Sequence, residues 1–378
     1  MKLLVIGSLA ESLVNFRGDL LRELVARGHQ VVGAAPPGPP WVAETLAGWG
    51  VRFAPLPMQR TGTSLRQDLE LYRAMKRLFA AERPDGVLGY TIKPVVYGSW
   101  AAAASGVRHI GAMITGLGYA FMPASSLPQR AVQAVARRML AAGLSRCDAV
   151  FFQNPDDEAE FRRRGLLPAR VRVVRINGSG VNVERYAQAP WPEGPPCFLF
   201  IGRLIRDKGI AEYIEAATVV RREFPQVRCR VVGPLDSNPS SLTQQEIDAA
   251  QAGGAIEYLG ALRDVRPALR EAHVLVLPSY REGTPRTVLE AMATGRPALT
   301  TDAPGCRETV EHDVSGWLVP PRDAAALAQA MLGLCRAPAE VLRQAGTRAR
   351  RRAEEVYDVR KVNQVLIDGW IPDREKAA

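Results

Sequence analysis

Short apolar runs alternate with amphipathic stretches along the first half of the chain. The predicted strands are residues 2–7, 30–35, 51–54, 86–90, 109–115, 149–153 and 171–175. Between them, residues 20–28, 66–81 and 129–144 have the spacing of helices with one apolar side, and Gly28 suits the position after a last helical turn. Strands and helices in alternation predict a parallel sheet covered by helices on both faces.

The alternation pauses at residues 177–180 and again at 189–192, and then starts a second time. The second set of predicted strands is 198–202, 227–233, 256–260, 273–278 and 298–301. This pattern predicts an α/β protein with two Rossmann-like domains that face each other across a cleft, with ligands at the carboxyl ends of the strands. We expect the domains to be 1–182 and 183–357, followed by a C-terminal helix within 358–378 that crosses back to the first domain.

Composition excludes several classes of protein. The chain has 378 residues, of which 47% are hydrophobic, so it is too long for one compact domain and too apolar to be disordered. Its five cysteines and four histidines are scattered, which argues against a disulfide framework and against a metal cluster. The apolar run at the start is too short for a signal peptide, and no stretch of about 20 residues is apolar enough to span a membrane. A cytoplasmic protein is expected.

The strongest chemical motif is at residues 280–295, where a buried strand leads through a tight loop into a short helix. Thr284 is a suitable N-cap, Pro285 suits the first helical position, and Gly295 suits the position after the last turn. The amides at the start of this helix, together with the positive end of its dipole, predict an anion site.

Two glutamates lie around this predicted anion site. Glu282 is in the loop, and Glu290 is five residues beyond Pro285, about 7.5 Å along the helix. Two carboxylates at different depths suit a sugar nucleotide, because the amides can take the phosphates while the carboxylates take sugar hydroxyls and the ribose. Alternatively, Glu282 is a loop charge and Glu290 a solvated helix residue. The coincidence of strand, glycine, cap and spacing favours the functional interpretation.

A second motif follows the predicted strand 198–202. Arg203 comes directly after this strand, and Lys208 follows five residues later. A guanidinium and an ammonium at the carboxyl end of a strand can bind a diphosphate leaving group and stabilise its developing charge. The alternative is that both are ordinary surface residues.

These motifs, together with Gly316–Val319, resemble those of retaining glycosyltransferases of the GT-B architecture in family 4. The resemblance covers nearly the whole chain. Several further segments resemble one branch of that family, which adds N-acetylhexosamine-type sugars to undecaprenyl-diphosphate-linked saccharides and includes N-acetylgalactosaminyltransferases of bacterial N-glycan assembly. These segments are 15–17 (Asn-Phe-Arg), 91–94 (Thr-Ile-Lys-Pro), 115–119 (Thr-Gly-Leu-Gly-Tyr), 153–157 (Gln-Asn-Pro-Asp-Asp) and 281–286 (Arg-Glu-Gly-Thr-Pro-Arg).

The resemblance implies that the first domain faces the acceptor and the second binds the sugar nucleotide. Arg203 and Lys208 would hold the donor diphosphate and Glu282 the hydroxyls of the donor sugar, so these three are the candidate catalytic residues. Further donor-binding candidates are Gly283, Thr284, Pro285, Arg286, Glu290 for the ribose, and Gly233, Leu259 and Gly260 beside the base. Candidates for the acceptor or the cleft are Asn15, Arg17, Thr91, Lys93, Thr115, Gly116 and Tyr119.

One departure from the family concerns a histidine that many members carry after the strand equivalent to 109–115. This chain has Thr115 and Gly116 there, while His109 lies at the opposite end of the strand and is expected to be structural. We therefore transfer no histidine role, and Thr115 or Lys93 is the candidate for that space.

The resemblance implies transfer of a sugar, N-acetylhexosamine-type in this branch, from a UDP-sugar to a polyprenyl-diphosphate-linked or other glycan acceptor in the synthesis of a bacterial surface polysaccharide or glycan. The chain has no Asp-x-Asp motif, so we expect no metal and no cofactor besides the donor substrate. The family retains the anomeric configuration of the donor sugar, and the sequence has no evident catalytic nucleophile. Together these imply that the acceptor attacks the same face of the sugar that the diphosphate leaves, with the departing phosphate taking the acceptor's proton.

Positive charge is concentrated in the first half of the chain. Residues 1–186 contain 24 Lys and Arg against 14 Asp and Glu, whereas the remainder contains 25 of each. In the predicted helix 129–144, one side is apolar and another is basic. The apolar side has Val132, Val135, Met139 and Leu140, and the basic side has Arg130, Gln133 and Arg137. With Arg138, these basic residues suit an anionic membrane surface or a lipid diphosphate held there, which predicts a peripheral protein on the inner face of the plasma membrane. A core helix with a solvated basic face is the alternative.

Other functions fit less well. Nucleic-acid binding would need a recognisable module or aromatic residues among the basic ones, and we expect none. A nicotinamide oxidoreductase would need glycines where residues 8–10 are Ser-Leu-Ala. A sugar-nucleotide 2-epimerase of the same architecture and a non-catalytic sugar-nucleotide-binding protein remain as alternatives.

Overall fold

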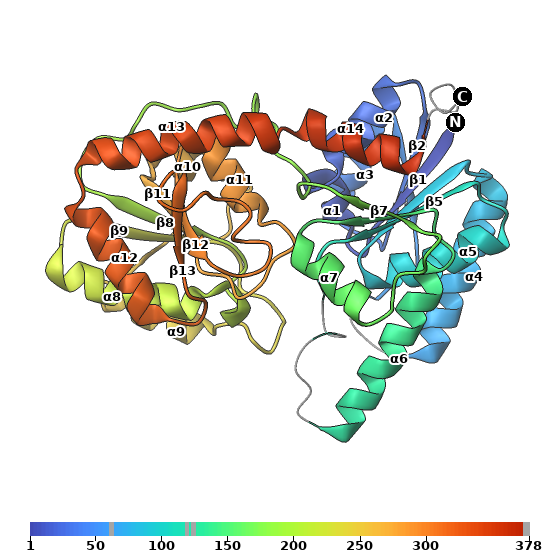
Figure 1. The fold of residues 1–378 in the computed structure, drawn as a ribbon, viewed down its shortest axis with the longest axis horizontal. Coiled ribbons are helices and arrows are strands. Elements are labelled where there is room, and N and C mark those ends of the chain that lie inside the picture. The colour runs from blue at the N-terminus through green and yellow to red at the C-terminus, as the bar shows by residue number, and fades with distance from the viewer. Residues whose placement is uncertain (60–63, 118–120, 122–125, 373–378) are drawn as a thin grey trace. The chain divides into compact units, whose positions relative to one another are not determined.

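The computed structural model describes residues 1–59, 64–117, 121 and 126–372. The chain forms two compact units (Figure 1). The first unit is Met1–Ser179 together with the C-terminal segment from Val359, and the second is Gly180–Asp358. Each unit is an α/β fold with one parallel sheet, so the predicted class of two Rossmann-like domains is confirmed. The boundaries differ from the predicted 182/183 and 357/358 by only one to three residues.

The sheet of the first unit has seven parallel strands in the order β3-β2-β1-β4-β5-β6-β7. The strands are β1 (Lys2–Ile6), β2 (Gln30–Ala35), β3 (Val51–Pro55), β4 (Gly86–Tyr90), β5 (His109–Ile114), β6 (Ala149–Phe152) and β7 (Arg172–Arg175). The order reverses between β1 and β4, which pair in register from Leu3 opposite Gly86 to Ile6 opposite Gly89. Ligand sites in such sheets lie at this reversal, outside the carboxyl ends of the strands.

Helices cover both faces of this sheet, and each face has its own apolar core. One face carries α4 (Leu65–Glu82), the π-helical turn η1 (Pro94–Gly98), α5 (Ser99–Ala104), α6 (Leu127–Leu144) and α7 (Pro155–Arg163). The other carries α1 (Ala10–Asn15), α2 (Gly18–Ala26), α3 (Pro40–Gly48) and α14 (Val359–Trp370). Trp370 of α14 is buried and donates a hydrogen bond to the carbonyl of His109, so the C-terminal helix is part of this core.

The sheet of the second unit has six parallel strands in the order β10-β9-β8-β11-β12-β13. They are β8 (Cys197–Ile201), β9 (Arg228–Val232), β10 (Glu257–Tyr258), β11 (Val274–Leu277), β12 (Ala298–Thr301) and β13 (Gly316–Val319). The order reverses between β8 and β11. The sequence pattern predicted a longer β10. It did not identify β13 as a strand, and in the structure Trp317 and Leu318 of this edge strand are only partly buried.

The helices of the second unit again form two layers (Figure 1). On one side of the sheet are α8 (Ile210–Glu223), α9 (Gln244–Ala252) and α12 (Ala324–Arg336), and the short 3₁₀ helix η3 (Arg206–Lys208) precedes α8. On the other side are α10 (Arg266–Glu271), α11 (Arg286–Ala293) and α13 (Ala339–Val356). Nearly every residue of α11 from Val288 to Ala293 is buried, so this helix is fixed in the core.

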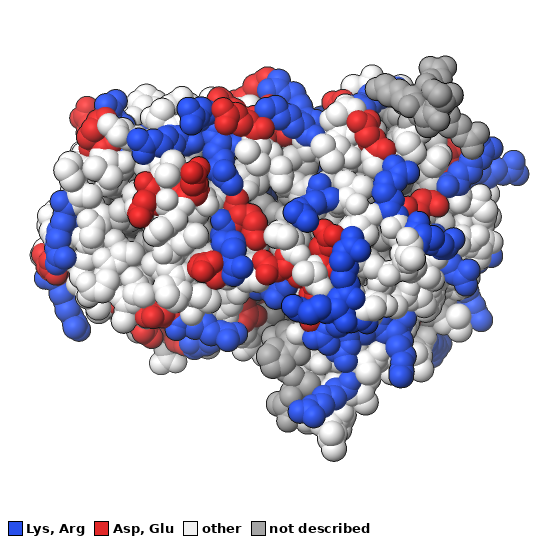
Figure 2. Space-filling view, in the orientation of Figure 1, with Lys and Arg blue, Asp and Glu red and all other residues white. Residues whose placement is uncertain are grey.

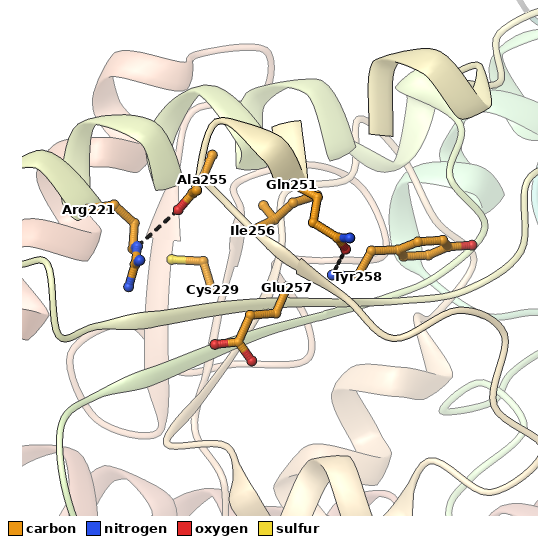
Figure 3. Close-up of a pocket in the computed structure, with 8 residues that line it drawn as sticks. Arg221, Cys229, Gln251, Ala255, Ile256, Glu257 and Tyr258 are labelled. Atoms are coloured by element: carbon orange, nitrogen blue, oxygen red, sulfur yellow. Dashed lines mark hydrogen bonds between the residues drawn. The ribbon is translucent and has the colours of Figure 1, made fainter. Parts of the chain in front are cut away.

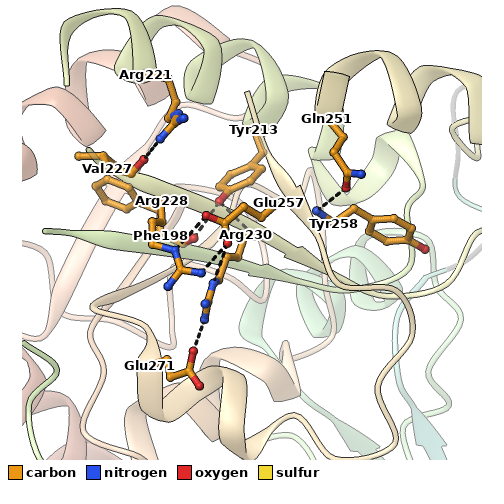
Figure 4. A network of polar contacts seen from close by, with 10 residues as sticks. All are labelled: Phe198, Tyr213, Arg221, Val227, Arg228, Arg230, Gln251, Glu257, Tyr258 and Glu271. Carbon is orange, nitrogen blue, oxygen red and sulfur yellow. Dashed lines mark hydrogen bonds and ion pairs between the residues drawn. The ribbon is translucent and has the colours of Figure 1, made fainter. Parts of the chain in front are cut away.

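An ion-pair network holds the short edge strand β10 in place (Figure 4). Arg228 and Arg230 of β9 both bind the carboxylate of Glu257 in β10, and Arg230 also binds Glu271 of α10. Arg230 is almost fully buried, so its two carboxylate partners compensate the cost of removing the guanidinium from water. The network positions Tyr258, the second residue of β10, whose hydroxyl donates to the carbonyl of Gly233.

The structure corrects the place of Gln133 in α6, which the sequence pattern put on the basic side of the helix. Gln133 is buried, whereas Val132 and Val135 are 44% and 53% exposed. The buried side is formed by Gln133, Leu140, Gly143 and Leu144. The reason is that α6 packs on η1 through its C-terminal half, where a Cβ on Gly143 would lie 3.0 Å from the backbone of Val96. Its N-terminal half therefore exposes Val132 and Val135 beside the basic residues.

Candidate functional site

The loops that carry Arg203, Lys208 and Glu282 meet where the strand order of the second sheet reverses. Arg203 follows β8, and Glu282 follows β11, the strand that pairs with β8. Because the strands are parallel, both loops leave the same edge of the sheet. This edge is the position at which a doubly wound sheet binds its ligand.

Lys208 and Glu282 form an ion pair across these two loops. The hydroxyl of Ser279 donates a 2.9 Å hydrogen bond to the same oxygen of Glu282. The loops approach closely because Gly209, at a φ of +73°, follows Lys208; a Cβ there would lie 2.1 Å from the carbonyl oxygen of Pro278. The side chains of Lys208 and Glu282 are 23% and 13% exposed, so the pair is largely buried but still reaches the surface.

Arg203 also has a carboxylate partner. Its Nη1 donates a 2.8 Å hydrogen bond to Oδ2 of Asp236, in the loop that follows β9. The other oxygen of Asp236 accepts from the backbone N–H of Asn238, so the carboxylate is held by its own turn. This loop is also bound to the loop after β8, since the N–H of Leu242 donates to the carbonyl of Leu204 and that of Arg206 donates to the carbonyl of Ser240.

Helix α11 begins at Arg286, with Pro285 as its N-cap residue, one position later than the sequence predicted. Thr284 is therefore not the N-cap, because the extended Pro285 already accepts the N–H of Val288 through its carbonyl. The amino end of α11 still lies at the carboxyl edge of β11, next to the Glu282 loop. Its first-turn amides and helix dipole favour an anion at this place.

Glu290 is buried rather than solvated, being 6% exposed. One of its carboxylate oxygens accepts hydrogen bonds from the hydroxyl of Tyr186 at 2.8 Å and from Nε of Arg286 at 2.9 Å. Burial raises the pKa of Glu290 above its usual value, while the charge of Arg286 acts in the opposite direction. The carboxylate is thus held within two turns of the start of α11.

The loop that follows β12 contacts the backbone of Glu282. The N–H of Glu282 donates to the carbonyl of Pro304, and Gly305 has a φ of +82°. A Cβ on Gly305 would lie 2.2 Å from the carbonyl oxygen of Glu282. The adjacent Cys306 is buried, which raises its pKa to about 12 and keeps the thiol neutral beside the Lys208–Glu282 pair.

The residues predicted to border the base lie at the carboxyl ends of β9 and β10. The N–H of Gly233 donates to the carbonyl of Gly260 at 2.9 Å, and Leu259 is 38% exposed. Gly283 and Thr284 lie in the loop between β11 and α11. The structure therefore collects all of the predicted donor residues along one edge of the second sheet.

The predicted acceptor residues of the first unit also lie at carboxyl ends of strands, with Thr91 and Lys93 after β4 and Thr115 and Gly116 after β5. Arg17 is buried, stacks on the ring of Tyr90 with its Cζ 4.9 Å from the ring centroid, and donates to the hydroxyl of Ser179. Asn15 is the last residue of α1 and is exposed. Tyr119 lies outside the described residues.

A cavity of about 400 Å³ elsewhere in the second unit does not belong to this site (Figure 3). Its lining includes Arg221, Cys229, Gln251 and Ala255. These residues lie near the beginnings of β9 and β10, at the amino edge of the sheet. Ligands of doubly wound sheets bind at the opposite edge, so this cavity carries no part of the predicted chemistry.

Basic side chains gather on the face of the first unit that carries α6 and α7 (Figure 2). Arg130 and Arg138 of α6 are exposed and Arg137 is partly exposed. Leu127, at the start of α6, is 76% exposed. Among the described residues, no helix has the length and hydrophobicity needed to span a bilayer.

Sequence reasoning did not identify four residues that hold the site together: Asp236, Ser279, Tyr186 and Gly305. Asp236 follows the predicted strand 227–233 closely, and this position was a signal that could have identified it. Tyr186 contacts a residue that is 104 positions away in the chain, so no local pattern could have paired it with Glu290.

Comparisons with known proteins identify a family match for each of the two units. Residues 15–177 match the glycosyl transferase 4-like domain, and residues 195–337 match the glycosyl transferases group 1. The chain is 24% identical, over 84% of its length and 85% of the relative's, to N,N'-diacetylbacillosaminyl-diphospho-undecaprenol alpha-1,3-N-acetylgalactosaminyltransferase of Campylobacter jejuni. It is also 31% identical over 51% of its length, and 50% of the relative's, to the putative colanic acid biosynthesis glycosyltransferase WcaL of Escherichia coli.

Solved structures show the same fold. Sucrose-phosphate synthase from Thermosynechococcus elongatus superimposes with a TM-score of 0.79 at 20% identity, covering 97% of each chain. Alr3699/HepE from Anabaena, crystallised with UDP and glucose, superimposes with a TM-score of 0.77 at 18% identity, covering 97% of this chain and 98% of the other. The two matched domains, the two parallel sheets and the residues at their carboxyl edges lead to one conclusion: the chain belongs to the GT-B glycosyltransferases, with a family 4-like first domain and a group 1 second domain.

Proposed function

We propose that the protein is a retaining glycosyltransferase that moves a sugar from a UDP-sugar to a polyprenyl-diphosphate-linked saccharide. The observation that carries the proposal is the convergence of Arg203, Lys208 and Glu282 at the strand reversal of the second sheet, beside the amino end of α11. The printed function of the Campylobacter relative supports the acceptor class. The UDP in the Anabaena structure supports the nucleotide.

In this proposal, different residues of the site bind different parts of the donor. Arg203 and Lys208 bind the diphosphate, and the amides at the start of α11 add to its stabilisation. Glu282 accepts hydrogen bonds from hydroxyls of the donor sugar, and Glu290 accepts them from the ribose. Side-chain cations and helix amides balance the charge of the leaving group in place of a metal ion.

The proposed reaction exchanges one bond at the anomeric carbon. The bond from this carbon to the diphosphate oxygen breaks, and a bond to the acceptor hydroxyl oxygen forms on the same face of the sugar. The hydroxyl proton passes to the departing phosphate, and the two cations stabilise the negative charge on that phosphate. The donor sugar is N-acetylhexosamine-type, which the name of the Campylobacter relative supports.

The first unit is the acceptor side and rests on an anionic membrane surface. Support comes from the outer face of α6, where Leu127 and Val135 alternate with Arg130 and Arg138. Exposed apolar side chains between arginines are typical of a helix that lies in a lipid interface. Binding to vesicles of phosphatidylglycerol at low salt tests this, with charge reversal of Arg130, Arg137 and Arg138 expected to abolish it. Equal binding by the reversed variant would contradict a role for α6.

The function itself is tested with a panel of UDP- and GDP-sugars, each with a polyprenyl-diphosphate saccharide, by product mass. One UDP-N-acetylhexosamine is expected to extend the acceptor by one residue. Conversion of a UDP-sugar in the absence of any acceptor would identify an epimerase instead. Tight UDP binding without turnover on any acceptor would identify a binding protein.

A further inference from the structure

The carboxyl end of β4, at the strand reversal of the first sheet, has an unusual backbone conformation. Thr91 follows β4 directly and has a φ of +70°, in the left-handed region that a β-branched residue rarely adopts. Its hydroxyl oxygen is buried without a hydrogen-bond partner. The chain then enters η1, a π-helical turn inside the helical segment at 92–104. Strained residues and π-turns occur mostly where a protein fixes a functional side chain.

The side chain fixed here is that of Lys93. Its Nζ donates a 2.8 Å hydrogen bond to Oδ1 of Asp68, in the first turn of α4. The hydroxyl of Tyr97, in η1, donates to the other oxygen of Asp68, also at 2.8 Å. The side chains of Lys93 and Asp68 are 14% and 13% exposed, so the pair is mostly buried but still reaches the surface. Within the described part of the chain, Lys93 thus has one carboxylate partner, Asp68, and it lies at the edge of the sheet where ligands bind.

Large apolar side chains lie immediately beside this pair along the chain. Leu65 and Leu69 are on the same first turns of α4 as Asp68, and they are 81% and 48% exposed. Ile92 precedes Lys93 and is 36% exposed. Exposed aliphatic side chains next in sequence to both members of a partly buried ion pair do not suit a water-soluble sugar, but they suit an anion that carries an apolar chain.

We infer that Lys93 binds the diphosphate of a polyprenyl-linked acceptor, which displaces Asp68 from the lysine, and that Leu65, Leu69 and Ile92 contact the first isoprene units. This inference rests on the proposed function for the acceptor class. Charge complementarity favours it, because a diphosphate carries more negative charge than the Asp68 carboxylate and competes for the same ammonium group. The alternative is that Asp68, Lys93 and Tyr97 only hold α4 against the helix that contains η1.

The two interpretations predict different effects of substitutions at Asp68 and Lys93 on the affinity for the ligand. If the diphosphate competes with Asp68, the variants D68N and K93M change ligand affinity in opposite directions. D68N removes the competing charge while its amide oxygen can still accept from Tyr97, and K93M removes the cation at similar length. If the cluster only joins two helices, both variants lower stability and neither changes affinity in this pattern.

The test is calorimetric titration of the full-length protein with farnesyl diphosphate in the absence of donor. K93M is expected to weaken binding about tenfold and D68N to strengthen it about threefold, with K93R close to wild type. Equal or same-sign changes in K93M and D68N would overturn the inference. Thermal melting of each variant shows that it is folded, and Y97F keeps the Lys93–Asp68 pair as the matched control.

The apolar contacts need a second comparison. The double variant L65S/L69S is expected to bind farnesyl diphosphate several-fold more weakly and inorganic diphosphate as wild type does. A loss of affinity for both ligands, or for neither ligand, would contradict the predicted isoprene contacts. Failure of the proposed function is distinguishable, because these titrations need no turnover: E282A is expected to lose transfer and keep the wild-type affinity for farnesyl diphosphate.

Discussion

Lys208 and Glu282 form an ion pair across the loops that follow β8 and β11, with the hydroxyl of Ser279 bound to the same carboxylate oxygen. The cation assigned to the proposed donor diphosphate and the carboxylate assigned to the donor sugar therefore contact each other directly. A diphosphate that binds Lys208 would compete with Glu282 for the same ammonium group.

The first prediction concerns this cation. Replacing Lys208 with Met removes a charge-assisted contact to the diphosphate, so the Kd for UDP should rise about tenfold in calorimetric titration. Arg206 provides the matched control: it belongs to the same short helix, but its guanidinium is paired with Glu246 and 51% exposed. R206M should bind UDP with the affinity of the wild type. An equal loss of UDP affinity in both variants would show that Lys208 contributes only through the overall positive charge of the protein.

The second prediction concerns Asp236, which binds Arg203 through one oxygen and the N–H of Asn238 through the other. Asp236→Asn can keep the turn and removes the charge that competes with the diphosphate. UDP should bind about threefold more tightly at low salt, and the gain should shrink as salt screens the site. Weaker UDP binding would mean instead that Asp236 orients Arg203 for the ligand.

The third prediction concerns the support of Glu282 by Gly305. A methyl group on Gly305 would meet the carbonyl oxygen of Glu282, which cannot move without displacing the loop. Gly305→Ala should therefore lower kcat at least tenfold, since a displacement of about 1 Å at a reacting group has large effects. Gly254 also has a positive φ, +71°, and nothing within 4 Å of the added atom. Gly254→Ala should cost about 1 kcal/mol of stability and leave kcat unchanged.

The fourth prediction is a pH dependence of stability from His273. This side chain is 5% exposed, and its Nδ1 accepts the N–H of Cys197. Burial, with the nearby charge of Arg296, lowers the pKa of His273 below its usual value. The neutral form is favoured in the folded state, so its stabilising contribution is complete above the unfolded pKa of about 6.5 and is lost as the pH falls below it.

Urea denaturation of the wild type between pH 7.5 and 5.5 should show the free energy of unfolding falling with a slope of at most about 1.4 kcal/mol per pH unit from this group. His273→Asn should flatten that slope, whatever its effect on stability at pH 7.5. An unchanged slope in the variant would assign the pH dependence to other groups.

Most of the fold could be predicted from the sequence because buried parallel strands are short continuous apolar runs. All seven strands of the first sheet were predicted, since their apolar residues are consecutive. Strand β13 was not predicted as a strand although Trp317, Leu318 and Val319 are consecutive apolar residues; in the structure Trp317 and Leu318 lie at the edge of the sheet and are partly exposed. The side of α6 that carries Gln133 was predicted wrongly, because the contact of this helix with η1 is set by Gly143.

The donor site was predictable where its residues directly follow predicted strands in the sequence. Glu282 and Arg203 each follow a strand, and parallel strands bring such residues to one edge. Their partners were not predictable, because Asp236 and Tyr186 reach the site from distant segments. The burial of Glu290 could not be deduced either, since it depends on how α11 packs in the core.

The measurement that tests the central claim most directly is the configuration of the transferred sugar. The protein is incubated with the UDP-α-sugar that it accepts and a polyprenyl-diphosphate saccharide, and the new linkage is assigned by the anomeric coupling constant in proton NMR, with E282A in parallel. An α-linked product from the wild type and none from E282A is the predicted result. A β-linked product, or an α-linked product formed equally well by E282A, would contradict a retaining transfer centred on Glu282.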